Sequence, residues 1–76
     1  MNISKTTYKK DNKNWIQCNT TTDEKEIYKS LAHDLIAKKL GVSFITRIKH
    51  RYNFDGTRTI DIYYDNGVKT RYIVER

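Results

Sequence analysis

"FITRIKHRYNFDG", residues 44–56, is the stretch that decides the fold of this 76-residue chain. As a strand, it alternates apolar and basic side chains between the two faces of a sheet. As a helix, it places the same arginines on another surface. Ile45, Thr46 and Ile48 favour the strand, because β-branched side chains lose rotamer freedom in a helix. We therefore predict a strand over residues 42–54.

Alternation along this strand separates its side chains into two sets. The even-numbered set is Val42, Phe44, Thr46, Ile48, His50, Tyr52 and Phe54. The odd-numbered set is Ser43, Ile45, Arg47, Lys49, Arg51 and Asn53. The first set predicts a face that packs on a helix, and the second predicts a face that meets water.

Two turn signals follow, FDG at residues 54–56 and DNG at residues 65–67. They predict a three-stranded antiparallel sheet over residues 42–75. A three-residue loop with glycine last keeps even-numbered residues opposite even-numbered ones, whereas a two-residue loop would mix the faces. All three strands then share one apolar face, from which Arg58 departs beside a turn.

The segment TTDEKEIYKSLAHDLIAKKLG predicts a helix over residues 22–40. Thr21 with Glu24, and Asp23 with Glu26, have the spacing of capping residues. The apolar stripe that we expect to face the sheet is Ile27, Tyr28, Leu31, Ala32, Leu35, Ile36 and Leu40. The residues that we expect to point outward are Lys25, Lys29, His33 and Lys39.

The first 20 residues predict a β-hairpin. ISKTTYKK and WIQCNTT suit a pleated surface, and DNKN at residues 11–14 between them suits a turn. We expect Cys18 as a small core residue and Trp15 as an anchor in the core or the hairpin. A disordered start over residues 1–5 is also compatible with this composition.

Together these elements predict one small α+β domain over residues 1–76. It consists of a hairpin over residues 1–20, a helix over residues 22–40 and a three-stranded antiparallel sheet over residues 42–75. The expected order is ββαβββ, with the helix packed on one face of the sheet.

Several features favour a cytoplasmic protein. The opening ten residues are polar and do not resemble a secretion signal. No apolar run approaches the ~20 residues that cross a bilayer, so no membrane partner is expected. The single cysteine excludes an internal disulfide.

The charge balance favours a polyanionic partner. Fifteen Lys and Arg residues oppose nine Asp and Glu residues, which gives a net charge of +6. Such an excess attracts nucleic acid or acidic protein surfaces. The arginines are Arg47, Arg51, Arg58, Arg71 and Arg76. Any site built on guanidinium groups must therefore lie in the C-terminal half.

The outer, polar face of the predicted three-stranded sheet carries the candidate nucleic-acid-binding residues. They are Arg47, Lys49, Arg51, Tyr63, Lys69 and Arg71, with Asp61 beside them. Arginine bonds phosphate and base edges, and tyrosine stacks on bases. We therefore expect a small, basic, non-enzymatic protein that binds DNA or RNA through this face. The alternative is a solvated face whose charge serves solubility.

Residues 31–50 also resemble the helix-turn-helix family of DNA-binding proteins. The matching positions are Ala37, Gly41, Val42 and Ser43, within the pattern A-x-x-x-G-V-S. The resemblance implies a recognition helix from Phe44 that presents Arg47, Lys49 and Arg51 to the major groove. The sequence departs from the family pattern, because Arg47 stands where an apolar residue belongs and no first helix precedes the motif.

The second functional hypothesis, ahead of the helix-turn-helix protein, is a protein-binding inhibitor. A compact basic chain without an active site is typical of small phage or mobile-element proteins that block a host nucleic-acid-handling complex, such as anti-CRISPR proteins. A basic face suits the acidic or nucleic-acid-handling surface of such a partner. This hypothesis rests on the type of protein, with no motif behind it.

The sequence gives little support for a catalytic site, a metal site or a bound cofactor. His33, His50 and Cys18 cannot complete a four-ligand zinc site, and three glycines form no phosphate-binding loop. We therefore expect neither a metal nor a cofactor. A small ribonuclease that uses His50 with a lysine or tyrosine as its acid–base pair is the least favoured alternative, because no spacing enforces that pair.

Overall fold

The computed structural model describes residues 3–75. Its elements are β1 (Ile3–Asp11), β2 (Asn14–Thr21), α1 (Glu24–Lys39), β3 (Ile45–Tyr52), β4 (Arg58–Tyr64) and β5 (Val68–Val74). The predicted ββαβββ order is confirmed. Residues 3–5 begin β1, whereas the rest of the expected disordered start, residues 1–2, lies outside the described residues, as does residue 76.

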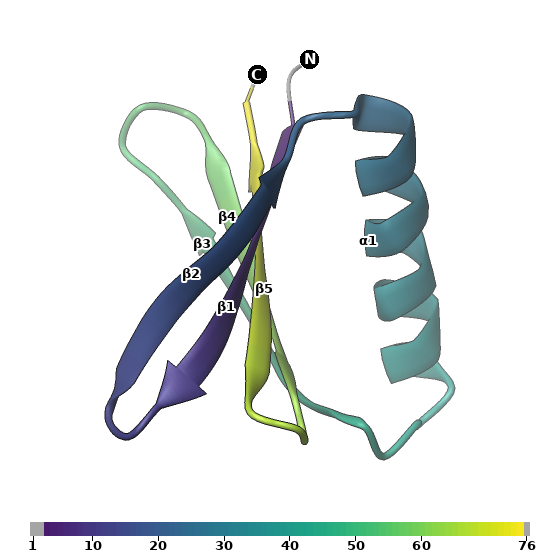
Figure 1. Ribbon diagram of the computed structural model, residues 1–76. Helices are drawn as coiled ribbons and strands as arrows, with labels where there is room; N and C mark the ends of the chain where they lie inside the picture. Colours follow the sequence, from purple (N-terminus) through teal and green to yellow (C-terminus); the bar gives the residue numbers. More distant parts are fainter. Residues whose placement is uncertain (1–2, 76) are drawn as a thin grey trace.

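All five strands form one antiparallel sheet in the order β2-β1-β5-β4-β3. The N-terminal hairpin joins the three C-terminal strands because β1 pairs with β5 as well as with β2. Helix α1 lies along one face of the sheet, and no other described element covers the opposite face (Figure 1). We call this opposite face the outer face.

The predicted phase of the three C-terminal strands is confirmed over most of their length. Gly56 and Gly67 have φ angles of 86° and 80°, which favour glycine at the last position of each loop. The Gly56 N–H donates to the Asn53 carbonyl, and the Asn53 N–H donates to the Thr57 carbonyl. Even-numbered residues therefore pair with even-numbered ones, as in Ile48 with Ile62 and Ile60 with Tyr72.

The prediction that Ile45 lies on the outer face is wrong. The register shifts between Ile45 and Arg47, so that Ile45 lies opposite Tyr64 and Arg47 lies opposite Tyr63. Ile45 is 2% exposed and belongs to the core, while Phe44 stays exposed. A bulge at the start of β3 accounts for the change, because one extra residue reverses the alternation before it.

Of the two predicted capping pairs of α1, Asp23 with Glu26 is confirmed. The Asp23 carboxylate accepts a hydrogen bond from the Glu26 N–H, and the chain leaves the helix through Gly41 with a φ of 82°. Acidic residues occupy the first turn and lysines the last turn, which suits the helix dipole.

The predicted inner stripe of α1 is only partly right. Ile27 and Leu31 are buried, as expected, and the helix residues that join them in the interior are Asp34 and Ala37. The members of the predicted stripe that remain exposed are Tyr28, Ala32, Leu35, Ile36 and Leu40. Leu35 continues the predicted row of Ile27 and Leu31 but lies away from the sheet, because the buried side of the helix follows positions 27, 31, 34 and 37.

Asp34 can occupy a core position because two tyrosine hydroxyls donate hydrogen bonds to its carboxylate. Its Oδ2 accepts hydrogen bonds from the hydroxyls of Tyr64 at 2.6 Å and Tyr72 at 3.0 Å. The Tyr72 hydroxyl also lies 2.7 Å from Ser30 Oγ, which accepts from Lys5 Nζ at 2.8 Å. Burial, followed by the bond to Asp34, raises the pKa of Tyr64, so this phenol remains a donor. The network ties α1 to β1, β4 and β5.

Apolar side chains from the helix and the sheet complete the core around this network. The buried members are Ile3, Ile27, Leu31, Ala37, Ile45, Ile60, Ile62, Tyr72 and Val74. Cys18 is not among them: it is exposed, contrary to its predicted core position. It lies on edge strand β2. The pairing with β1 shifts register at this point, because Thr7 pairs with Asn19 and Tyr8 pairs with Gln17.

Replacing Asp34 tests this network. In Asp34→Ala, the hydroxyls of Tyr64 and Tyr72 both lose this acceptor, so we expect the free energy of unfolding to fall by about 3 kcal/mol. Asp34→Asn keeps one oxygen acceptor and should lose less. The exposed helix residue Lys29, replaced with Ala, should change stability by less than about 0.5 kcal/mol. Urea denaturation followed by circular dichroism measures all three, and equal losses in Asp34→Ala and Lys29→Ala would contradict this account.

Candidate nucleic-acid interface

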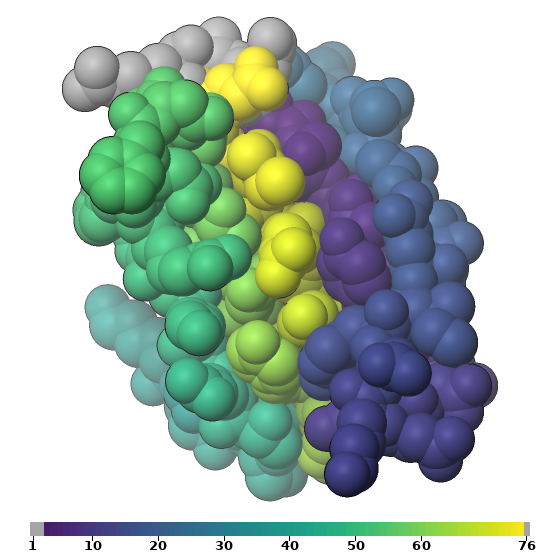
Figure 2. Space-filling view, turned by 90° about the vertical axis from the view of Figure 1, so that its left-hand side faces the viewer, coloured from purple at the N-terminus to yellow at the C-terminus, as the bar shows by residue number. Residues whose placement is uncertain are grey.

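Figure 2 shows the outer face, with β5 in the middle, β4 and β3 on one side and β1 and β2 on the other. The six predicted binding residues all lie on this face. Cross-strand pairing places Arg47, Tyr63 and Lys69 in one row, and Lys49, Asp61 and Arg71 in the next. Arg51 continues the line of cations along β3.

Lys69 is enclosed rather than free, which sequence reasoning did not predict. It is 6% exposed, and its Nζ lies over three ring centroids: Tyr8 at 5.1 Å, Trp15 at 4.6 Å and Tyr63 at 5.6 Å. Ring faces attract a cation, and the attraction grows when water is excluded. Burial, followed by repulsion from Arg71, lowers the pKa of Lys69. We call Lys69 and the three rings around it, Tyr8, Trp15 and Tyr63, the Lys69 cluster.

The rings of the Lys69 cluster keep part of their surface open to solvent. Trp15 and Tyr63 are half-buried and meet edge to face, with centroids 5.9 Å apart. The Arg47 guanidinium lies over Tyr63 at 5.7 Å, and Lys10 Nζ lies over Trp15 at 5.5 Å. Aromatic surface bordered by cations is the combination on which nucleic-acid bases stack.

Arg71 is held by partners inside the protein. Its Nε donates to Asp61 Oδ1 at 2.8 Å, and its Nη2 donates to Asp61 Oδ2 at 3.3 Å. Asp61 is 2% exposed, and its bond raises the pKa of Arg71. The guanidinium also lies 5.5 Å from the Tyr8 ring centroid. These contacts fix the orientation of the Arg71 side chain, so only the exposed part of its guanidinium group is available to a ligand.

Three cations on β3 remain open. Arg47, Lys49 and Arg51 are all exposed, and no ion pair to any of them is found within residues 3–75. Alternate residues on a strand repeat every ~6.6 Å, so the three form a regular line along the edge of the sheet. Such a line suits the successive charges of a polyanion.

Sequence reasoning missed the part of the site that comes from the N-terminal hairpin. Tyr8, Lys10 and Trp15 reach this face because β1 pairs with β5 and places Tyr8 opposite Lys69. The alternation of β1 could have shown that Tyr8 and Lys10 share a face. It could not show which strand the hairpin would join, and Trp15 was expected only as an anchor.

The helix-turn-helix resemblance does not hold, because Ile45–Tyr52 forms strand β3. Arg47, Lys49 and Arg51 therefore project from a sheet. No known protein family, curated protein or solved structure matches the chain.

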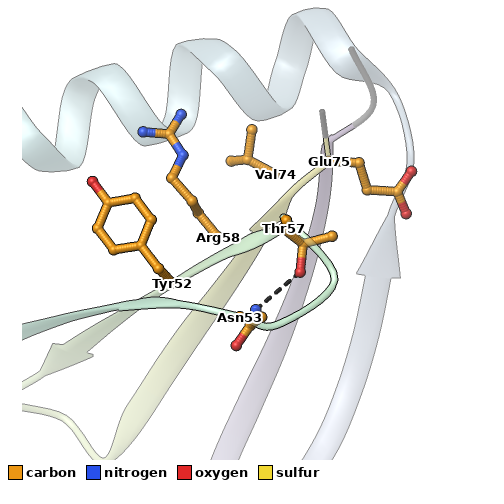
Figure 3. A pocket seen from close by; sticks show the side chains of 7 residues that line it. Tyr52, Asn53, Thr57, Arg58, Val74 and Glu75 are labelled. Atoms are coloured by element: carbon orange, nitrogen blue, oxygen red, sulfur yellow. Dashed lines mark hydrogen bonds between the residues drawn. The ribbon is translucent and has the colours of Figure 1, made fainter.

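Other hollows within residues 3–75 include no residue of the Lys69 cluster, and one of them is an apolar hollow lined by Ile36, Leu40 and Phe44. No group of three or more His, Cys, Asp and Glu side chains could hold a metal ion within this range, and no helix there is long and apolar enough to cross a bilayer. An open hollow of about 400 Å³ lies beside the β3–β4 loop (Figure 3). Its wall includes Arg58, Tyr52 and Val74 on the helix side of the sheet and no residue of the Lys69 cluster.

Substitution of Lys69 tests whether it holds the rings together. Lys69→Ala removes the enclosed cation, so we expect a loss of about 1–2 kcal/mol in the free energy of unfolding and a red shift of Trp15 emission. Lys69→Met keeps the length of the side chain and separates packing from charge. The exposed Lys49→Ala should change stability by less than about 0.5 kcal/mol. An unchanged Trp15 spectrum in Lys69→Ala would contradict the cluster.

Proposed function

We propose that the protein binds nucleic acid through the outer face of its sheet. The observation that carries this proposal is a set of half-buried rings, Tyr8, Trp15 and Tyr63, lying beside open cations on a face that no described element covers. The rings supply stacking surface and the cations supply phosphate contacts, which are the two parts of sequence-tolerant nucleic-acid binding.

The distribution of charge supports the same face. Within the strands, the outer face carries one carboxylate, Asp61, and the cations Lys10, Arg47, Lys49, Arg51, Lys69 and Arg71. Residues 23–40 around the helix contain four acidic side chains and four lysines, so the helix segment itself has no net charge. The positive excess of the chain is therefore concentrated on the outer face, which steers a polyanion toward it.

In this proposal, one group of residues contacts the phosphates and another provides the stacking surface. Arg47, Lys49 and Arg51 on edge strand β3 contact phosphates, because they are exposed and lack internal ion pairs among the described residues. The Lys69 cluster lies over the interior of the sheet and provides ring surface. Lys69 and Arg71 act mainly by positioning, since both are bound to internal partners.

A charge-matched pair of variants tests the proposal. The outer-face variant replaces Arg47, Lys49 and Arg51 with Ala, and the control replaces the helix residues Lys25, Lys29 and Lys39 with Ala. Both lose three positive charges. We expect the outer-face variant to lose at least about tenfold in affinity for oligonucleotides at low salt, and its salt slope to become shallower by about two. The control should retain the affinity of the natural protein.

Equal losses in the two variants would contradict the proposal, because they would show attraction to total charge rather than to this face. Unchanged affinity in the outer-face variant would contradict it as well. A stoichiometric protein partner that survives nuclease treatment, and that the outer-face variant no longer captures, would instead favour the protein-binding inhibitor.

A further inference from the structure

The Lys69 cluster has features that a purely solvated face does not need. Three rings from three strands converge on one lysine, and their ring surface stays half-open on a face with no covering layer among the described elements. An aromatic side chain contributes most when it is fully buried, so Tyr8, Trp15 and Tyr63 would be better placed under α1 if they served stability alone.

We infer that the outer face takes an unpaired strand, with bases stacked on the rings, rather than a duplex. This inference rests on the proposed function and names the class of nucleic acid that the same site accepts. It follows from the position of the rings, from the width of the sheet and from the line of cations on β3.

The width of the sheet opposes insertion of the whole outer face into the major groove of B-form DNA. Five strands spaced ~4.8 Å apart span about 19 Å, whereas the major groove of B-form DNA is about 12 Å wide and admits a helix or a two-stranded ribbon. The Lys69 cluster lies over the inner strands β1, β5 and β4, with Trp15 covering it from β2. A duplex could therefore contact the cations on β3 with its phosphates, but its stacked bases could not reach the rings.

An unpaired strand satisfies both parts of the surface. Its phosphates follow Arg47, Lys49 and Arg51 along the edge strand, while its bases turn inward across β4. The planar Arg47 guanidinium already lies 5.7 Å from the Tyr63 ring centroid, and this pair offers one stacking position. Trp15 offers the second, next to Tyr63 at 5.9 Å between ring centroids. Stacking of this kind tolerates every base, so the site prefers unpaired over paired strands without strong sequence preference.

The experiment compares three probes of the same length: a thymidine oligonucleotide, the duplex that it forms with its complement, and an abasic oligonucleotide with the same phosphates. The intact protein is titrated with each at low salt, with Trp15 emission as one readout and fluorescence anisotropy as the other. We expect the thymidine strand to bind at least about tenfold more tightly than the other two probes, because each stacked base contributes ~1–3 kcal/mol. Trp15 emission should be quenched only by the strand with unpaired bases.

Variants of Trp15 and a neighbour complete the test. Trp15→Ala should lose about tenfold for the thymidine strand and keep its weaker affinity for the abasic probe. Trp15→Phe retains a ring beside Lys69 and should keep most of the affinity, which separates stacking from damage to the cluster. The control Gln17→Ala alters an exposed β2 side chain that lies opposite Tyr8 on the same face, and it should bind all three probes normally.

Equal, salt-dependent affinity for the three probes, without quenching of Trp15, would overturn the inference and leave the proposed function in place. Tighter binding of the duplex would overturn it in the same way. The absence of binding to every probe would overturn both the inference and the proposed function.

Discussion

The enclosed ammonium group of Lys69 is the contact on which the outer face depends. It lies 4.6–5.6 Å from the centroids of rings carried by β1, β2 and β4, while Lys69 itself belongs to β5, the middle strand. The N-terminal hairpin and the C-terminal strands are thereby joined through side chains as well as through backbone pairing. Without this cation, three aromatic side chains on an uncovered face would lack a common partner.

On each face of the sheet, a buried charged side chain has aromatic residues as partners. Under the helix, the Asp34 carboxylate accepts hydrogen bonds from the hydroxyls of Tyr64 and Tyr72. On the outer face, the Lys69 ammonium lies among ring faces. Burying an ion is costly unless such partners replace water. Alternation along β5 serves both faces, since Tyr72 points to the helix and Lys69 points away from it.

The sequence predicted the fold where its signals are local. Alternation within β3 places Arg47, Lys49 and Arg51 on one face, and the glycine-ended loops set the phase that brings Tyr63 and Lys69 to the same face. The buried position of Asp34 was not predictable, because its phenol partners come from strands distant in sequence. The enclosure of Lys69 was missed for the same reason: its rings Tyr8 and Trp15 arrive through the pairing of β1 with β5, which no local pattern encodes.

The most direct measurement is a map of amide and side-chain chemical shifts during titration with a short unpaired oligonucleotide at low salt. The account predicts that the largest changes fall on Tyr8, Trp15, Tyr63 and Arg47, with small changes along α1. Changes concentrated on the helix, or spread evenly over the molecule, would contradict the assignment of the outer face as the binding surface.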